Sequence, residues 1–246
     1  MSLEPLFLWI GTAAMALGAA LFLFVSFRAR AEDRHHYLTS FLIVLVAATA
    51  YFAMSIGQTH VTLSDGHSIY YARYIDWAIT TPLLLLGLAT IGMTAISVNR
   101  TLVYAMLASD VYMILTGLAG ALSVDHSRWL WFVFSCGGFS AVLAILWGPI
   151  RAEARARGRE TVYVRLARVL TILWIVYPLE WVLGEEGVRA ISSATETVIV
   201  AIVDIAAKVA FGYLSLRAVD ALPPAIEEGG TIVSSERVRR EAPASR

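Results

Sequence analysis

The chain has 246 residues and no formal net charge; 58% of its residues are hydrophobic, 15% are charged, and the mean hydropathy is +0.69. This composition excludes an ordinary water-soluble domain and indicates a membrane protein. The single cysteine, Cys136, excludes an intrachain disulfide and a cysteine metal site, and the histidines show no metal-ligand spacing. We therefore expect no bound metal.

Seven apolar runs are long enough to cross a bilayer, which takes about 20 residues each. No basic segment or cleavage site accompanies the first run, so we expect it to be a retained span. We predict an all-α bundle of seven transmembrane helices within residues 1–222, followed by a flexible cytoplasmic C-terminal tail over 223–246. The expected spans lie near residues 5–27, 38–59, 70–93, 101–122, 129–149, 163–183 and 192–217.

The arginines predict the orientation of the bundle. Fifteen of them follow spans one, three, five and seven, whereas the other side carries only Arg73, Arg128 and Arg189. By the positive-inside rule, the N-terminus is extracellular and the C-terminus is cytoplasmic.

The third span carries a polar stripe. Arg73, Asp76 and Thr80 fall at i, i+3 and i+7 and share one helix face. Gly87 lies almost three turns beyond Asp76 on the same face, roughly 16 Å further towards the cytoplasm. A bundle-holding ion pair is one reading, but charges at membrane depth are costly and usually functional, so the stripe predicts a functional site.

The fourth span places Asp110, Met113 and Gly117 on one face. We expect Asp110 to be protonated and hydrogen-bonded, because burial disfavours the charged form of a carboxyl group. An interhelical hydrogen bond that packs the bundle is favoured over a direct role in ion transfer.

The sixth span contains an aromatic wall formed by Trp174, Tyr177 and Trp181, again at i, i+3 and i+7. Such a stripe alone is more typical of core packing than of a cofactor site. If the aromatic wall faces a charged pair in another span, a cofactor site becomes the better interpretation.

Several acidic residues lie near the extracellular mouth. Glu186 and Glu196 are either interfacial carboxylates or a pair that shares a labile proton. We expect Glu180, Glu185 and Arg189 to face solvent or lipid headgroups.

Lys208 is the only lysine, and it lies inside the apolar run 198–216. A lysine, unlike an arginine, can lose its proton and form a Schiff base with a carbonyl compound. Asp204 lies four residues earlier on the same helix face. A protonated imine in a dry interior needs such a counterion.

Three segments together resemble the microbial (type I) rhodopsins, and most of all the bacteriorhodopsin-like light-driven proton pumps. They are Arg73-Tyr-Ile-Asp-Trp77 with Thr80-Thr-Pro-Leu-Leu-Leu-Leu86, Leu173-Trp-Ile-Val-Tyr-Pro-Leu-Glu-Trp181, and Asp204-Ile-Ala-Ala-Lys208-Val-Ala-Phe-Gly212. The resemblance covers about residues 4–218, and the joint match is highly specific. It implies an ion transporter rather than an enzyme, with all-trans retinal bound to Lys208 as a protonated Schiff base.

The resemblance also implies individual roles. Asp76 corresponds to the primary counterion and proton acceptor, Asp204 to the second counterion, and Arg73 to a gating arginine. Thr80 stabilises the protonated form of Asp76, and Leu84 occupies a position where leucine accompanies green absorption. Glu186 and Glu196 correspond to an extracellular proton-release pair. The implied retinal pocket comprises Tyr51, whose hydroxyl joins the counterions, and Trp77, Thr81, Leu84, Asp110, Met113, Gly117, Trp131, Ser135, Trp174, Tyr177 and Trp181.

Two departures from the family pattern matter. Gly87 stands where fast pumps place a carboxylic proton donor, so the trio Asp76, Thr80 and Gly87 resembles pumps without an internal donor. Ala50 stands where one branch places a histidine that pairs with the acceptor. We expect reprotonation through water past Gly87 or from His35, His36 or Asp33, and therefore a slow, pH-dependent recovery.

Other functions remain in view. The main alternative is a sensory rhodopsin that signals through a separate transducer. Chloride and sodium pumping are disfavoured by the aspartate at 76 and the threonine at 80, and a chromophore-free structural protein is the weakest reading. We expect protons and the lipid bilayer as partners, a homo-oligomer (trimer or pentamer), no nucleic acid, and location in a bacterial inner membrane.

Overall fold

The computed structural model describes residues 3–31, 33–94 and 99–221, and these contain seven helices long and apolar enough to cross a membrane. The predicted seven-helix bundle is confirmed, while the predicted tail at 223–246 lies outside the described residues. The α-helices are α1 (Leu3–Ser26), α2 (Arg34–Ser55), α3 (Tyr71–Met93), α4 (Arg100–Ala121), α5 (Ser127–Ile145), α6 (Arg151–Ala156), α7 (Glu160–Leu183), α8 (Ser193–Ile205) and α9 (Phe211–Asp220).

Two of the spans are composite, because a π-helical turn joins two α-helices into one rod. Leu146–Ile150 joins α5 to α6, so this span runs from Ser127 to Ala156 and passes the expected end at residue 149. Pro149 lies within that turn. A proline has no backbone N–H to donate to the regular hydrogen-bond ladder, and a π turn interrupts that ladder, so the two features are compatible. Ala206–Ala210 joins α8 to α9.

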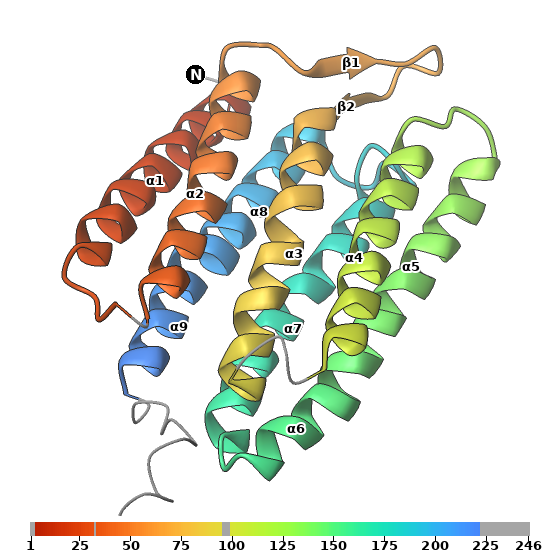
Figure 1. The fold of residues 1–246 in the computed structure, drawn as a ribbon. Helices are drawn as coiled ribbons and strands as arrows, with labels where there is room; N and C mark the ends of the chain where they lie inside the picture. The colour runs from red at the N-terminus through yellow and green to blue at the C-terminus, as the bar shows by residue number, and fades with distance from the viewer. Residues whose placement is uncertain (1–2, 32, 95–98, 222–246) are drawn as a thin grey trace, which may run out of the picture.

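The spans form one bundle, with the N-terminus and the loop after α2 at one end and α6 and the end of α9 at the other (Figure 1). Helices α1 and α8, far apart in sequence, pack against each other and close the ring. Hereafter the hairpin end is the end that carries the strands β1 and β2, and the opposite end is the one that carries α6.

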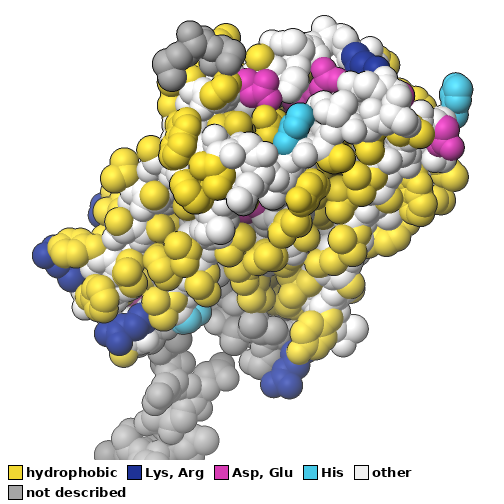
Figure 2. Space-filling model, turned by 90° about the horizontal axis from the view of Figure 1, so that it is seen from above, with side chains coloured by type: hydrophobic (Ala, Val, Ile, Leu, Met, Phe, Trp, Pro, Cys, Tyr) yellow, Lys and Arg dark blue, Asp and Glu magenta, His cyan; other side chains and the backbone are white. Residues whose placement is uncertain are grey.

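Large apolar side chains remain exposed on the outside of the bundle. Leu17 is 72% exposed, and Figure 2 shows many hydrophobic side chains spread over the visible surface. A soluble monomer rarely shows so much contiguous apolar surface. Lipid contact explains it, and the chain is a multi-pass membrane protein.

A short β-hairpin lies between α2 and α3, and the sequence did not predict it. Strands β1 (His60–Thr62) and β2 (Ser68–Tyr70) pair antiparallel, with His60 opposite Tyr70. The turn includes Gly66, whose φ of 85° lies in the left-handed region that glycine tolerates best.

His67 fastens this hairpin to the bundle. Its side chain is fully buried; Nδ1 lies 2.5 Å from Asp65 Oδ1 and Nε2 lies 2.8 Å from the Ala121 carbonyl oxygen at the end of α4. Burial alone would raise the pKa of Asp65, but hydrogen bonds from Arg128 and His67 hold this pKa well below its usual range. The two ring nitrogens of His67 therefore link the turn of the hairpin to the end of α4.

We expect His67→Gln to loosen this attachment, because the amide cannot reproduce the contacts of both ring nitrogens. The free energy of unfolding should fall by about 2 kcal/mol. Thermal unfolding followed by circular dichroism measures the effect. The exposed His126→Gln is the matched control, and equal unfolding temperatures for both variants would contradict the anchoring role.

Candidate functional site

Lys208 lies at the centre of a buried charge cluster. It sits in the π turn between α8 and α9, is 2% exposed, and donates hydrogen bonds from Nζ to Asp76 Oδ2 and, at 3.1 Å, to Asp204 Oδ1. Asp76 comes from the buried face of α3, and Asp204 lies one turn before the lysine on α8. The structure thus brings one ammonium group between two carboxylates, an arrangement that can hold a buried cation.

The two carboxylates differ in their hydrogen bonds. Asp204 Oδ1 accepts from Lys208, from Trp77 Nε1 at 3.2 Å and from the Tyr177 hydroxyl at 2.6 Å, and its Oδ2 accepts from the Tyr51 hydroxyl at 2.9 Å. Asp204 thus accepts hydrogen bonds from four donors, and both of its carboxylate oxygens have a partner.

Asp76 has fewer partners. Its Oδ2 accepts from Lys208, whereas its Oδ1 is buried and has no hydrogen-bond partner among the described residues. The Thr80 hydroxyl donates to the backbone oxygen of Asp76 at 2.8 Å. Asp76 therefore has a free oxygen that can take a proton.

An apolar cavity lies beside this cluster. Trp77 and Tyr177 border it and also hold Asp204, so the cavity and the lysine share one wall. Among its lining residues are Trp77, Thr81, Met113, Gly117, Ser135, Trp174, Tyr177 and Trp181 from the predicted pocket. At Gly117 an added Cβ would meet Ser135 Oγ at 3.4 Å, so the glycine keeps this wall open. An elongated apolar cofactor fits such a cavity.

Asp110 lies behind the cavity wall instead of lining the cavity. It is fully buried, and the Thr81 hydroxyl lies 2.7 Å from both its Oδ2 and the backbone oxygen of Trp77. One hydroxyl hydrogen cannot serve two acceptors fully. A protonated Asp110 that donates to Thr81 satisfies both contacts.

Of the other residues predicted for the pocket, Tyr51 is hydrogen-bonded to Asp204, and Trp131 and Leu84 lie away from this cavity. Trp131 is 36% exposed and does not line the cavity; its neighbour Phe132 does, and it stacks on Trp181 with ring centroids 4.7 Å apart. Ser135, on the same helix, lines the cavity as expected, so Phe132 and Ser135 belong to the face that α5 presents to the cavity, and a contact between Trp131 and retinal stays a prediction. Leu84 is buried but lines a second cavity, towards the opposite end.

At the hairpin end, Arg73 connects the lysine region to a group of glutamates. Arg73 is 4% exposed and donates from Nη1 to Glu196 Oε1 at 2.6 Å and from Nη2 to the Thr197 hydroxyl at 2.8 Å. Glu186 Oε1 accepts from the Tyr74 hydroxyl at 3.2 Å. Burial and the nearby Glu196 raise the pKa of Glu186 to about 8.

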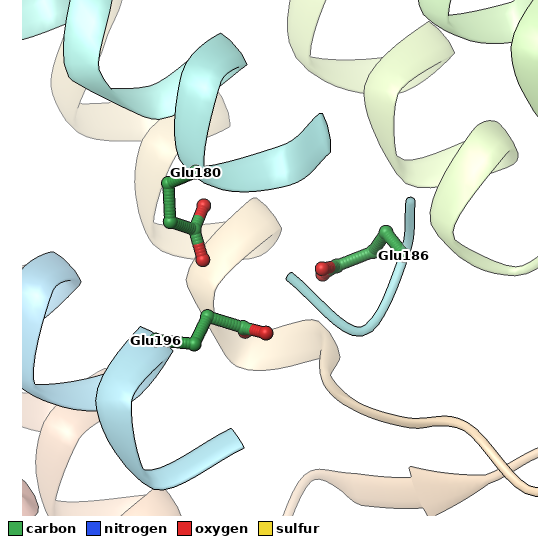
Figure 3. A group of neighbouring side chains, drawn as sticks. All are labelled: Glu180, Glu186 and Glu196. Atoms are coloured by element: carbon green, nitrogen blue, oxygen red, sulfur yellow. The ribbon is translucent and has the colours of Figure 1, made fainter. Parts of the chain in front are cut away.

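The expectation that Glu180 faces solvent or headgroups was wrong. Glu180 is 6% exposed, and its carboxyl group is directed towards those of Glu186 and Glu196 (Figure 3). The reason is helical spacing: position 180 is three residues after Tyr177 and so continues the face of the aromatic wall. That spacing is the signal that sequence reasoning missed.

The second cavity lies between α2, α3 and α9, towards the opposite end. His36, Ser40, Gly87 and Ser215 are among its lining residues, and an added Cβ on Gly87 would have no atom within 4 Å. Of the three loop groups considered for reprotonation, His36 is the one that borders this cavity. Asp33 instead accepts a hydrogen bond from Arg30 at 2.7 Å.

Comparisons with known proteins agree with this arrangement. Residues 2–222 match the family described as bacteriorhodopsin-like protein. The chain is 38% identical to archaerhodopsin-3 of Halorubrum sodomense over 221 residues, covering 87% of this chain and 84% of the relative. It is also 38% identical to the bacteriorhodopsin of Haloterrigena sp. (strain arg-4), with 87% of each chain covered.

Solved structures give the same result. The thermophilic rhodopsin from Rubrobacter xylanophilus superposes with a TM-score of 0.85 at 38% identity, covering 87% of this chain and 95% of that one. The light-driven proton pump of Coccomyxa subellipsoidea superposes with a TM-score of 0.83 at 38% identity, with 88% and 97% covered. Family members bind retinal through a lysine Schiff base, and they are light-driven ion pumps, not enzymes. The chain belongs to the bacteriorhodopsin-like family of microbial rhodopsins.

Proposed function

We propose that this protein is a light-driven outward proton pump that carries all-trans retinal on Lys208 and lacks an internal carboxylic donor. The observation that carries the proposal is the buried lysine between a fully hydrogen-bonded carboxylate, Asp204, and a carboxylate with a free oxygen, Asp76. The hairpin end is taken as the extracellular side, in line with the arginine distribution.

The bound retinal would supply light-driven isomerisation, which redirects the N–H at the Lys208 nitrogen. Asp204 keeps its charge because four donors hold it, so the proton passes to Asp76. Once Asp76 is neutral, Arg73 is held mainly by Glu196, which lies towards the hairpin end. This shift of charge prompts release of a proton from the glutamates there.

Reprotonation from the opposite end is proposed to use the second cavity. Gly87 leaves open space beside it, and His36 borders it near the start of α2. The Ser215 hydroxyl is buried there without a partner among the described residues, which marks a place where water can bind. His36 thus stands between bulk solvent and the interior and can pass protons inward.

Gly87→Asp is expected to speed recovery of the pigment by about 100-fold at neutral pH, since a positioned proton donor contributes on that order. The side chain fits, because the Cβ position is empty. Flash photolysis across a range of pH measures the recovery rate, which should also lose its pH dependence. Gly137→Asp, at another glycine with an empty Cβ position, is the control and should leave recovery slow.

The proposed function is tested by the external pH of retinal-fed expressing cells under green light, with and without a protonophore. Acidification that the protonophore abolishes supports outward pumping. Coloured cells that give no pH change would instead favour a sensory rhodopsin with a separate transducer. Cells without retinal provide the baseline.

A further inference from the structure

The hairpin end holds three buried glutamates rather than a pair. Glu180 on α7, Glu186 in the following loop and Glu196 on α8 are 6%, 5% and 3% exposed. One carboxylate oxygen from each lies within 4.8 Å of the others, and Figure 3 shows the three groups directed towards one another.

The hydrogen bonds divide the three groups into one anion and two acids. Glu196 accepts from Arg73 at 2.6 Å and from the backbone N–H of Glu185 at 3.0 Å, so its charge is compensated. Glu180 Oε1 and Glu186 Oε2 are buried and have no partner among the described residues. An ionised carboxylate without donors is costly in such a place, whereas a carboxylic acid supplies a donor of its own.

The local charges lead to the same division. The titratable and charged groups that face the cluster are Arg73, Tyr70 and Tyr74 from the end of the hairpin and α3, Arg128 from α5, and the glutamates themselves. Arg73 is the one cation among them that bonds a carboxylate of the cluster. With one guanidinium and three carboxyl groups, the cluster is neutral when two of the carboxyl groups keep their protons.

We propose that Glu180 is a third proton-holding residue of the extracellular release group, which stores two protons among Glu180, Glu186 and Glu196. Glu180 also lines the apolar cavity of the functional site, so it links that cavity to the release group. The raised pKa of Glu186, about 8, agrees with a proton that is retained at neutral pH. The role of Glu180 in proton release rests on the proposed pumping function, whereas the presence of a proton on Glu180 does not.

A divalent cation is the other ligand that three carboxylates can hold. Arg73 already occupies one face of Glu196, and Arg128 Nη1 lies 3.3 Å from the backbone oxygen of Glu186. Two guanidinium groups at these positions would repel a second cation strongly. Shared protons therefore satisfy the cluster better.

The first test is the infrared spectrum of the purified pigment in the dark, for the parent and for Glu180→Gln. The parent is expected to show a protonated-carboxyl band, sensitive to deuterium exchange, that Glu180→Gln loses. Glu153→Gln, at the opposite end, should keep the band. An unchanged spectrum in Glu180→Gln would overturn the proposal. A band that appears when a chelator is added and disappears when Ca²⁺ is added would also overturn it, because the cluster would then hold a cation in place of the protons.

The second test follows proton release after a flash with a pH-sensitive dye. Glu186→Gln is expected to keep early release, because Glu180 still shares a proton with Glu196, and the double variant Glu180→Gln/Glu186→Gln is expected to lose it. If Glu186→Gln alone loses as much early release as the double variant, Glu180 is not part of the store. A parent that never releases protons would instead defeat the pumping function, and the dark spectrum would still decide whether Glu180 holds a proton.

Discussion

Lys208→Ala is expected to give a colourless protein that cannot be reconstituted with retinal and transports no protons. The amine is the attachment atom, and the sequence contains no other lysine. The change also leaves Asp76 and Asp204 buried without their shared cation. Removal of one partner of a buried ion pair costs about 3 kcal/mol or more, so the free energy of unfolding should fall by that amount.

Lys208→Arg separates the two effects. Arginine keeps the positive charge but does not form a Schiff base, so the variant should be as colourless as Lys208→Ala while regaining part of the lost stability. Visible absorption after retinal addition and thermal unfolding followed by circular dichroism measure the two properties. Visible colour in either variant would contradict the attachment at Lys208.

The bundle could be predicted from the sequence because the bilayer sets a simple requirement. A span needs about 20 apolar residues, and each of the seven runs meets it with polar breaks between. The polar face of α3 was predictable for a related reason: Arg73, Asp76 and Thr80 are conspicuous in an apolar helix, and their spacing gives their common side.

Smaller features could not be predicted, because they depend on contacts between segments. The strands β1 and β2 have three residues each, too short for an alternating pattern. The choice of the α5 ring that lines the cavity was equally hidden: where lipid and protein both present apolar surfaces, hydrophobicity does not distinguish Trp131 from Phe132.

The glutamates at the hairpin end show the same limit. Sequence position alone left Glu186 and Glu196 open between interfacial and functional roles, and it placed Glu180 in solvent or among lipid headgroups. Their burial depends on how α7 and α8 meet α3 around Arg73, and only the folded bundle brings these residues together.

Asp76→Asn is expected to leave a coloured protein that no longer pumps. Lys208 keeps Asp204 as its counterion, and that carboxylate retains its bonds from Trp77, Tyr177 and Tyr51, so retinal binding should survive. The amide cannot accept the proton. Since a positioned proton acceptor contributes about 100-fold or more, light-driven acidification per bound retinal should fall by at least that factor.

The exposed Asp125→Asn makes the same chemical change outside the bundle core and should pump like the parent. Asp204→Asn gives the decisive contrast. If Asp204 is the permanent anion, the main effect of Asp204→Asn should be a loss of stability and colour, because four hydrogen bonds depend on that carboxylate. Any Asp204→Asn protein that still binds retinal should still transfer the proton to Asp76. The opposite result would be an Asp76→Asn variant that still pumps and an Asp204→Asn variant that is coloured but does not pump. In that case the roles of the two carboxylates would be reversed, and the free oxygen of Asp76 would not mark the proton acceptor.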